Sequence, residues 1–199
     1  LAPAAADGVE AVVDGVQKFY ADAHDLKARF TQTYTYKVYD RKQVSSGTVY
    51  FKKPRRMRWD YTTPQPKVFV ADGQTLWVYE PEENQVFKRS LKSAQLPVAL
   101  TFMSGEGDLK AAFHTKLLPS KDADRYLVEL VPKKHEGDYQ KLLLHVDKAT
   151  FAVRASTVVD PVGNTNHVRF EDVSTSVGLP DSGFQFTPPA GVRVITDAK

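Results

Sequence analysis

The segment from Gly47 to Tyr79, GTVYFKKPRRMRWDYTTPQPKVFVADGQTLWVY, decides the fold of this chain. Its short runs VYF, MRWDY, VFVAD and TLWVY are rich in aromatic and β-branched residues, which favour strands. The breaks between these runs contain the turn-forming sequences Lys53-Pro54, Pro64-Gln65-Pro66 and Asp72-Gly73. The segment is therefore predicted to be a meander of consecutive antiparallel strands.

The apolar residues of these strands are not confined to one face. A half-buried strand alternates apolar with polar residues, whereas Val68, Phe69 and Val70 are consecutive, as are residues 76–79. This pattern predicts a curved sheet that is covered on both faces, with apolar groups on its concave side. An ordinary core with one helix behind the sheet is the alternative, because small barrels are usually filled by their own side chains.

The composition is typical of one globular domain, spanning residues 1–199, with 42% hydrophobic and 26% charged residues. No apolar run approaches the length of a membrane span. The net charge of +3 is too small to require a nucleic-acid partner. The lack of cysteine excludes disulfides and thiolate catalysis. The first residues, LAPAAADG, suit the region after a removed signal peptide, although an artificial chain end would look the same.

Helices are predicted at two places outside the meander. The first is an amphipathic helix that follows Asp7 as N-cap, with apolar residues at Val9, Val12, Val13, Val16 and Phe19. The second place is the apolar stretch 93–113, where one short helix is expected to end at Gly105 and another to cover 108–113. Apolar insertions of this kind are usually core plugs, and the functional alternative is a movable cover over a cavity.

The remaining segments predict strands. They cover residues 26–38 and 85–89 on either side of the meander, and then 113–119, 125–132, 141–146, 151–159 and 165–177. Turns are expected at 40–42, 122–124, 135–138, 147–150 and 161–164. The closing FQFTPPAGVRVI predicts a strand that ends at the proline pair and a last extended segment. The fold class is therefore mainly β with short α.

No catalytic or metal-binding motif is found in the sequence. The five histidines, His24, His114, His135, His145 and His167, do not show the spacing of metal ligands. Neither a Gly-x-Ser-x-Gly elbow nor a P-loop occurs, and Gly105-Glu106-Gly107 lacks the lysine of a phosphate loop. A hydrolase acting on an apolar ester would need a nucleophile beside a base, with His145 or His167 as candidates, and the spacing supplies none.

A basic cluster lies at the centre of the meander. It comprises Lys52, Lys53, Arg55, Arg56 and Arg58, beside Trp59 and Tyr61. Met57, Trp59 and Tyr61 have one strand parity and Arg56 and Arg58 the other, which predicts an apolar inside and a solvated outside. A solvated face is favoured over a docking surface for an acidic partner, and both are favoured over a nucleic-acid site.

Several motifs, in their order along the chain, resemble those of one protein family. They are Phe30-Thr31-Gln32, Gly47-x-x-x-Phe51-x-Lys53-Pro54 leading to Arg58-Trp59, Pro64, Asp72-Gly73-x-x-x-Trp77-x-Tyr79-x-Pro81, and Phe184-x-Phe186-x-Pro188-Pro189-x-Gly191-Val192. Together they resemble the periplasmic outer-membrane lipoprotein carriers of the LolA family, from about residue 25 to residue 194. The resemblance implies an unclosed antiparallel β-barrel of about 11 strands, covered by a lid of about three short helices and enclosing an apolar cavity.

The resemblance also implies a function without enzymatic activity and without a cofactor. Such a carrier accepts a triacylated lipoprotein from an inner-membrane ABC transporter of the LolCDE type and delivers it to an outer-membrane acceptor of the LolB type. It would work in the periplasm as a monomer. The alternative within the same fold is a LolB-like acceptor, which would be anchored through an N-terminal cysteine, or a lipoprotein-sensing domain. A long acyl chain left in water costs on the order of 10 kcal/mol, so a carrier must bury it.

The resemblance assigns expected roles to particular residues. The acyl-chain cavity would be lined by Val49, Phe51, Met57, Trp59, Phe69 and Trp77, and the lid would include Val12, Val16, Val98, Leu100, Phe102 and Met103. Lys53 would bond the lid where the family usually has arginine, and its ammonium lacks the planar fork of a guanidinium, so Arg55 or Arg56 is the alternative. The rim that docks to the transporter and acceptor would comprise Arg55, Arg56, Met57 and Arg58.

Overall fold

The structure is a computed structural model that describes residues 8–91, 102–104, 107–134 and 139–196. Several expectations fall outside these residues. They are the N-cap at Asp7, the lid residues Val98 and Leu100, the helix end at Gly105 and the turn at 135–138.

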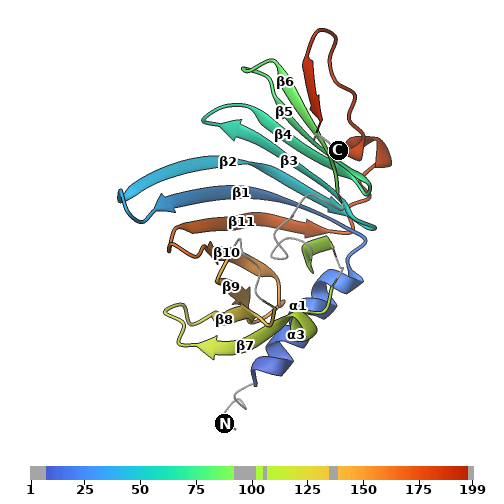
Figure 1. The fold of residues 1–199 in the computed structure, drawn as a ribbon. Helices are drawn as coiled ribbons and strands as arrows, with labels where there is room; N and C mark the ends of the chain where they lie inside the picture. The colour runs from blue at the N-terminus through green and yellow to red at the C-terminus, as the bar shows by residue number, and fades with distance from the viewer. Residues whose placement is uncertain (1–7, 92–101, 105–106, 135–138, 197–199) are drawn as a thin grey trace.

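Within the described residues, twelve strands form one open sheet in the order β12-β6-β5-β4-β3-β2-β1-β11-β10-β9-β8-β7. The first six strands are β1 (Asp25–Tyr36), β2 (Arg41–Lys52), β3 (Arg56–Thr63), β4 (Lys67–Asp72), β5 (Thr75–Glu80) and β6 (Gln85–Ser90). The others are β7 (Phe113–Leu118), β8 (Arg125–Pro132), β9 (Lys141–Asp147), β10 (Val153–Val159), β11 (Thr165–Thr175) and β12 (Arg193–Thr196). Figure 1 shows the sheet bending from β12 to β7, with its two end strands left apart. The predicted mainly-β, unclosed fold is confirmed.

The meander is formed by β2 to β5, as predicted, and a bulge in it depends on glycine. The pairing of β2 with β3 shifts register between Ser46 and Gly47. A Cβ atom on Gly47 would lie 1.9 Å from the carbonyl oxygen of Asp60, so only glycine fits between the two backbones. The β1–β2 turn lies earlier than predicted, because β1 ends at Tyr36 and Arg41 already belongs to β2.

The first helix lies where it was predicted but has another N-cap, and the helices of the second region are shorter than expected. Helix α1 (Val9–Asp22) buries Val12, Val13, Val16 and Tyr20, and its N-cap is Gly8, which has no side chain to cap with. In the second helical region the described residues contain a 3-10 helix, η1 (Phe102–Ser104), and the one-turn helix α3 (Leu109–Ala112). The carboxylate of Asp108 caps α3 by accepting a hydrogen bond from the Ala111 N–H, and Phe113 already begins β7.

The two faces of the sheet are covered by different parts of the chain. The face toward α1 and η1, here called the inner face, carries the main apolar core. On the outer face, residues 176–189, here called the strap, cross β3, β4 and β5 before β12 pairs in parallel with β6. The predicted strand over residues 184–186 is wrong: Asp181–Phe184 form the 3-10 helix η2, and Phe186 packs on Trp77 and Tyr79. Two-sided coverage explains the consecutive apolar residues of β4 and β5.

Candidate functional site

The inner face of the meander brings together five of the six residues that were expected to line a cavity. Val49, Trp59 and Phe69 are successive cross-strand neighbours on β2, β3 and β4, and Phe51 lies opposite Met57 in the same way. All five belong to, or pack against, the main core. Because residues directly across an antiparallel sheet share a face, these side chains form one continuous apolar surface.

Trp77 does not belong to that surface. Its ring lies 5.8 Å from the ring of Phe186 in the strap, and the ammonium of Lys88 lies 5.1 Å from the Trp77 ring. Its neighbours Leu76 and Val78 contact the inner core instead, because successive residues of a strand point to opposite faces. The assignment of Trp77 to a cavity was therefore wrong.

Trp59 lies at the centre of the inner face and is surrounded by aromatic rings. The ring centroids of Phe30, Phe51, Phe170 and Tyr61 lie 4.8, 6.1, 6.3 and 6.4 Å from that of Trp59. The Tyr61 ring is stacked on the indole, with 26° between the two planes. Trp59 is only 5% exposed, and its indole Nε1 has no hydrogen-bond partner in the part of the chain that the structure describes. Phe30 and Phe170, which face each other across β1 and β11, were missed although both strands alternate apolar and polar residues there.

A short polar chain borders this aromatic group. The hydroxyl of Tyr61 donates to Gln32 Oε1 over 2.9 Å, and Gln32 Nε2 donates to Asn166 Oδ1 over 2.9 Å. Burial raises the pKa of the Tyr61 phenol to about 12. The hydroxyl therefore stays neutral and paired, which leaves the Trp59 N–H as the unpaired polar group of the inner face among the described residues.

The space between the inner face and the helices is occupied by side chains of α1 and η1, which we call the lid. Val12, Val16, Phe102 and Met103 are all buried in the core that contains Phe51 and Trp59. The Tyr20 ring meets that of Phe102 edge-on, with centroids 5.3 Å apart. Among the described residues, side chains of the lid therefore occupy the space against the inner face in which an enclosed apolar cavity was predicted.

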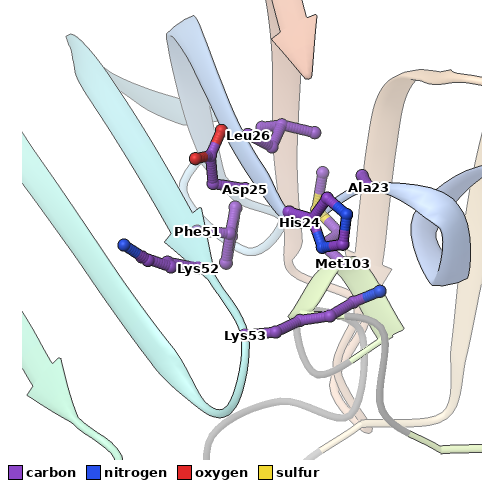
Figure 2. A pocket seen from close by; sticks show the side chains of 8 residues that line it. All are labelled: Ala23, His24, Asp25, Leu26, Phe51, Lys52, Lys53 and Met103. Atoms are coloured by element: carbon purple, nitrogen blue, oxygen red, sulfur yellow. The ribbon is translucent and has the colours of Figure 1, made fainter. Parts of the chain in front are cut away.

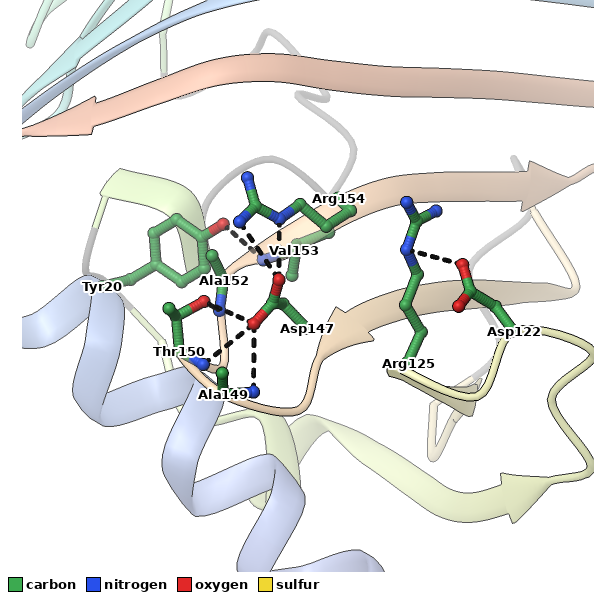
Figure 3. Close-up of polar contacts among 9 residues, drawn as sticks. All are labelled: Tyr20, Asp122, Arg125, Asp147, Ala149, Thr150, Ala152, Val153 and Arg154. Carbon is green, nitrogen blue, oxygen red and sulfur yellow. Dashed lines mark hydrogen bonds and ion pairs between the residues drawn. The ribbon is translucent and has the colours of Figure 1, made fainter.

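The lid is also tied to the far half of the sheet through Tyr20. Its hydroxyl accepts a buried hydrogen bond from the Val153 N–H over 3.1 Å (Figure 3). The turn before Val153 is held by the Asp147 carboxylate, which accepts from the Thr150 N–H and from the Arg154 guanidinium. Tyr20 continues the helical spacing of Val12 and Val16, so the periodicity of the sequence contained a signal for it, although the predicted apolar face ended at Phe19.

The same turn places Phe151 directly against α1. Phe151 has a positive φ of 62°, which turns its ring onto the helix. A Cβ atom on Gly15 would lie 2.4 Å from the nearest ring carbon of Phe151. Gly15, which weakens the helix by itself, is therefore the residue that lets the turn and the helix approach each other.

Lys53 lies at the end of the lid where α1 meets β1 (Figure 2). Its ammonium donates a hydrogen bond to the carbonyl of Ala21 in the last turn of α1, and its backbone N–H donates to the His24 carbonyl over 3.2 Å. A small pocket beside it, of about 10 Å³, is lined by residues that include Leu26, Phe51 and Met103. A cation at the C-terminal end of a helix also interacts favourably with the helix dipole.

The basic residues expected at a docking rim are not gathered on one surface. Lys52 and Arg56 each lie 2.7 Å from the Asp181 carboxylate in the strap, and Arg58 donates to the carbonyl of Gly183 over 3.1 Å. Met57 is buried on the opposite face, and Arg55 is exposed in the β2–β3 turn. The outer face of these strands is therefore neither a solvated face nor an open basic patch, since Lys52, Arg56 and Arg58 bind the strap.

Asp25 secures the beginning of the strap. Its carboxylate is buried and accepts hydrogen bonds from the N–H groups of Val177 and Leu179 over 2.7 and 2.8 Å. Lys52, its cross-strand neighbour, donates to the Leu179 carbonyl over 2.5 Å. The first residue of β1 and the last of β2 thereby hold the segment that leaves β11.

The two histidines considered for a hydrolase lie together on the outer face. The rings of His145 and His167 are 6.1 Å apart, and His167 Nδ1 lies 2.8 Å from the Thr157 hydroxyl. Burial lowers the pKa of both imidazoles. They face away from the apolar inner surface, so they are not placed to act on a group bound there. Within the described ranges no group of acidic and histidine side chains is arranged to hold a metal ion, and no helix is long and apolar enough to cross a membrane.

Comparison with known proteins gives consistent matches over most of the chain. A family model described as "Outer membrane lipoprotein carrier protein LolA" matches residues 21–187. An outer-membrane lipoprotein carrier protein of Methylibium petroleiphilum is 33% identical over 92% of this chain and 88% of its own length. That of Dechloromonas aromatica is 31% identical over 92% and 86%.

Solved structures show the same fold at low sequence identity. An uncharacterised conserved protein from Thermus thermophilus has a TM-score of 0.60 at 12% identity, with 94% of this chain and 98% of that chain covered. The MucA/MucB complex of Pseudomonas aeruginosa contains a chain with a TM-score of 0.51 at 12% identity, with 88% of this chain and 60% of that chain covered. These two likenesses concern the arrangement of the sheet and helices alone.

Proposed function

Because this chain belongs to the LolA family of outer-membrane lipoprotein carrier proteins, we propose that it carries lipoproteins with their acyl chains held against the inner face. Lipoprotein carriage and a place in the periplasm follow from the family. The site, the movement that exposes it and the partners are our proposal. We further propose that residues 1–199 act as a single carrier unit.

The observation that carries the proposal is the apolar inner face beneath a lid that is held mainly by apolar contacts. Val49, Phe51, Met57, Trp59 and Phe69 line the face, and Val12, Val13, Val16 and Tyr20 of α1 cover it. Burying four such lid side chains contributes roughly 6 to 12 kcal/mol. Since one long acyl chain gains on the order of 10 kcal/mol from burial, replacing these four side chains by one chain of the cargo is close to balanced. A carrier needs this balance, because it must both load and release.

Loading would then consist of moving α1 away from the inner face. Lys53 and Tyr20 each hold α1 by one hydrogen bond, at opposite halves of the sheet. The partners proposed for loading and delivery are an inner-membrane transporter of the LolCDE type and an outer-membrane acceptor of the LolB type. Arg55, the exposed member of the expected rim, is the residue we retain for contact with them.

The carrier function is tested by incubating the purified chain with a triacylated lipoprotein in detergent below its critical concentration. We expect a soluble complex in gel filtration, and no complex with the same lipoprotein after its acyl chains have been removed. Failure of the acylated form to enter a soluble complex would contradict the carrier function.

The lid movement is tested with a disulfide between two introduced cysteines. The sequence contains no cysteine, so no other thiol can compete with this pair. A Cβ at position 15 would lie 2.6 Å from Phe151 Cγ, which brings Gly15→Cys and Phe151→Cys within the range of a disulfide, with Cβ atoms about 3.5–4.5 Å apart. We expect the oxidised double variant to load poorly and the reduced one to load normally. The Phe151→Cys single variant is the matched control, because a Cβ atom at position 15 beside an intact Phe151 ring would clash with it. Equal loading in both redox states would show that α1 does not have to leave this turn.

A further inference from the structure

Trp59 combines a position at the centre of the inner face with an unused hydrogen-bond donor. Its side chain is 5% exposed, and its Nε1–H has no acceptor among the described residues. The surrounding rings of Phe30, Phe51 and Phe170 offer no acceptor. The indole N–H is therefore buried and unpaired while the lid is closed.

An unpaired buried donor is unfavourable, because it has lost its hydrogen bond to water without replacement. A phenylalanine would fill most of the same space among these rings without that cost. By contrast, Tyr20 and Tyr61, two further polar aromatic residues of the inner core, have hydroxyls that are both hydrogen-bonded. Among these three, the group that lacks a partner is the one at the centre of the surface proposed to receive cargo.

An acylated cargo brings the complementary group. Each of its hydrocarbon chains begins at an ester or amide carbonyl, whose oxygen is an acceptor that must also be paired when it leaves water. We propose that the indole N–H of Trp59 donates a hydrogen bond to an acyl carbonyl of the cargo. This inference rests on the proposed function and adds a specific chemical group to it.

The consequence is a fixed depth for the bound lipid. An apolar face alone binds hydrocarbon in any register, because hydrophobic burial is not directional. One donor at Trp59 places a carbonyl at that point, with the hydrocarbon lying on the remaining aromatic and aliphatic side chains. The site then discriminates acyl chains, which have the carbonyl, from alkyl chains, which lack it.

The test compares two synthetic lipopeptides that differ only at this group. One has an S-glyceryl-cysteine with two palmitoyl esters, and the other has two hexadecyl ethers. Binding is measured for the full chain and for Trp59→Phe, and Trp77→Phe is the matched control because that tryptophan lies on the outer face. We expect the wild type and Trp77→Phe to prefer the ester by between about twofold and tenfold, and Trp59→Phe to bind both lipopeptides equally.

A second readout uses the indole N–H itself. The chain has two tryptophans, so its two indole proton resonances can be assigned with Trp77→Phe alone. We expect the Trp59 resonance to move downfield with the ester and not with the ether. Equal affinity of the wild type for both lipopeptides, with no such difference in resonance, would overturn the inference and leave the carrier function intact. Failure of the wild type to bind either lipopeptide would instead count against the proposed function.

Discussion

The hydroxyl of Tyr20, on α1, accepts a hydrogen bond from the backbone N–H of Val153, on β10, over 3.1 Å in the buried core. Burial raises the pKa of this phenol far above its ordinary value, so it stays neutral under all ordinary conditions. The lid is thus attached to the sheet by a directional contact as well as by apolar packing. A directional contact defines one closed position, which packing alone does not.

Replacing Tyr20 by phenylalanine is expected to loosen the lid. The variant keeps the ring but leaves the Val153 N–H buried and unpaired, which should lower the free energy of unfolding by about 1–3 kcal/mol. Urea denaturation measures this change, and amide exchange of Val12 and Val16 measures whether the loss falls on α1. Tyr39→Phe, at an 80% exposed position in the β1–β2 turn, should change stability by less than about 0.5 kcal/mol. Unchanged exchange in α1 would show that this hydrogen bond does not hold the lid.

Replacing Lys53 is expected to alter release more than loading. Lys53→Leu removes the hydrogen bond to the Ala21 carbonyl and a cation at the end of α1, worth about 0.3–1 kcal/mol at an exposed site. Bound lipoprotein should then pass to lipid vesicles about two to five times more slowly, because the closed, empty form that displaces the acyl chains is weakened, whereas Lys53→Arg should speed its release. Lys18→Met, which removes an exposed cation from the same helix, is the control. Equal release rates for all variants would exclude a role of Lys53 in closure.

The elements of the sheet could be predicted from the sequence because their signals are local. Strand parity placed Met57 and Trp59 on one face and Arg56 and Arg58 on the other, and the structure has them so. The parity of Trp77 was not determined by the same rule, because β5 is apolar on both faces. Its orientation depends on Phe186 in the strap, which lies 109 residues further along the chain (186 − 77).

The contacts that hold the lid and the strap could not be predicted, because they are formed between segments distant in sequence. Nothing near Tyr20 indicates that its partner is the Val153 backbone, and nothing near Arg56 indicates that its partner is Asp181. In the sequence, a strand face whose basic residues bind the strap therefore cannot be distinguished from a docking surface. The unpaired N–H of Trp59 is equally invisible in the sequence, because it is a property of the packed core.

Stability in alkaline solution should depend on Tyr61. Burial raises its pKa from 10.0 to about 12 in the folded chain. Because the folded-state pKa lies above the unfolded one, its contribution is complete below pH 10 and is lost as the pH rises towards 12. The free energy of unfolding of the wild type should therefore fall more steeply across this range than that of Tyr61→Phe, as measured by urea titrations at several pH values. Parallel curves for the two proteins would contradict the assignment.

The bulge at Gly47 should not tolerate a side chain. A Cβ atom there would overlap the Asp60 carbonyl, and since that group belongs to the backbone of β3, the two strands must separate to make room. Gly47→Ala is expected to lower the free energy of unfolding by about 3 kcal/mol or more. Gly183→Ala, with no atom within 4 Å of the added Cβ, should change it by less than about 0.5 kcal/mol. A Gly47→Ala protein with wild-type stability would mean that this register shift is not maintained.

Attachment of the strap should depend on the charge of Asp181. Its carboxylate accepts a hydrogen bond from Lys52, which lowers its pKa below the ordinary value, and the nearby Arg56 lowers it further. Because the folded-state pKa is depressed, the stabilisation is present above pH 3.8 and is lost as the pH falls through the lower folded value. Asp181→Asn should expose the strap at neutral pH, which limited proteolysis between residues 176 and 189 would detect.

The matched control for the strap is Asp172→Asn, which removes an exposed carboxylate paired with Arg29 elsewhere on the sheet. It should leave proteolysis of the strap unchanged. In acid, the strap of the wild type and that of Asp181→Asn should become equally sensitive to proteolysis, because protonation of Asp181 removes the same charge that the substitution removes. If Asp181→Asn stays resistant at neutral pH, then Phe186 against Trp77 and Tyr79, together with the β12–β6 pairing, holds the strap without the ion pairs. The cluster of basic residues would then need another explanation.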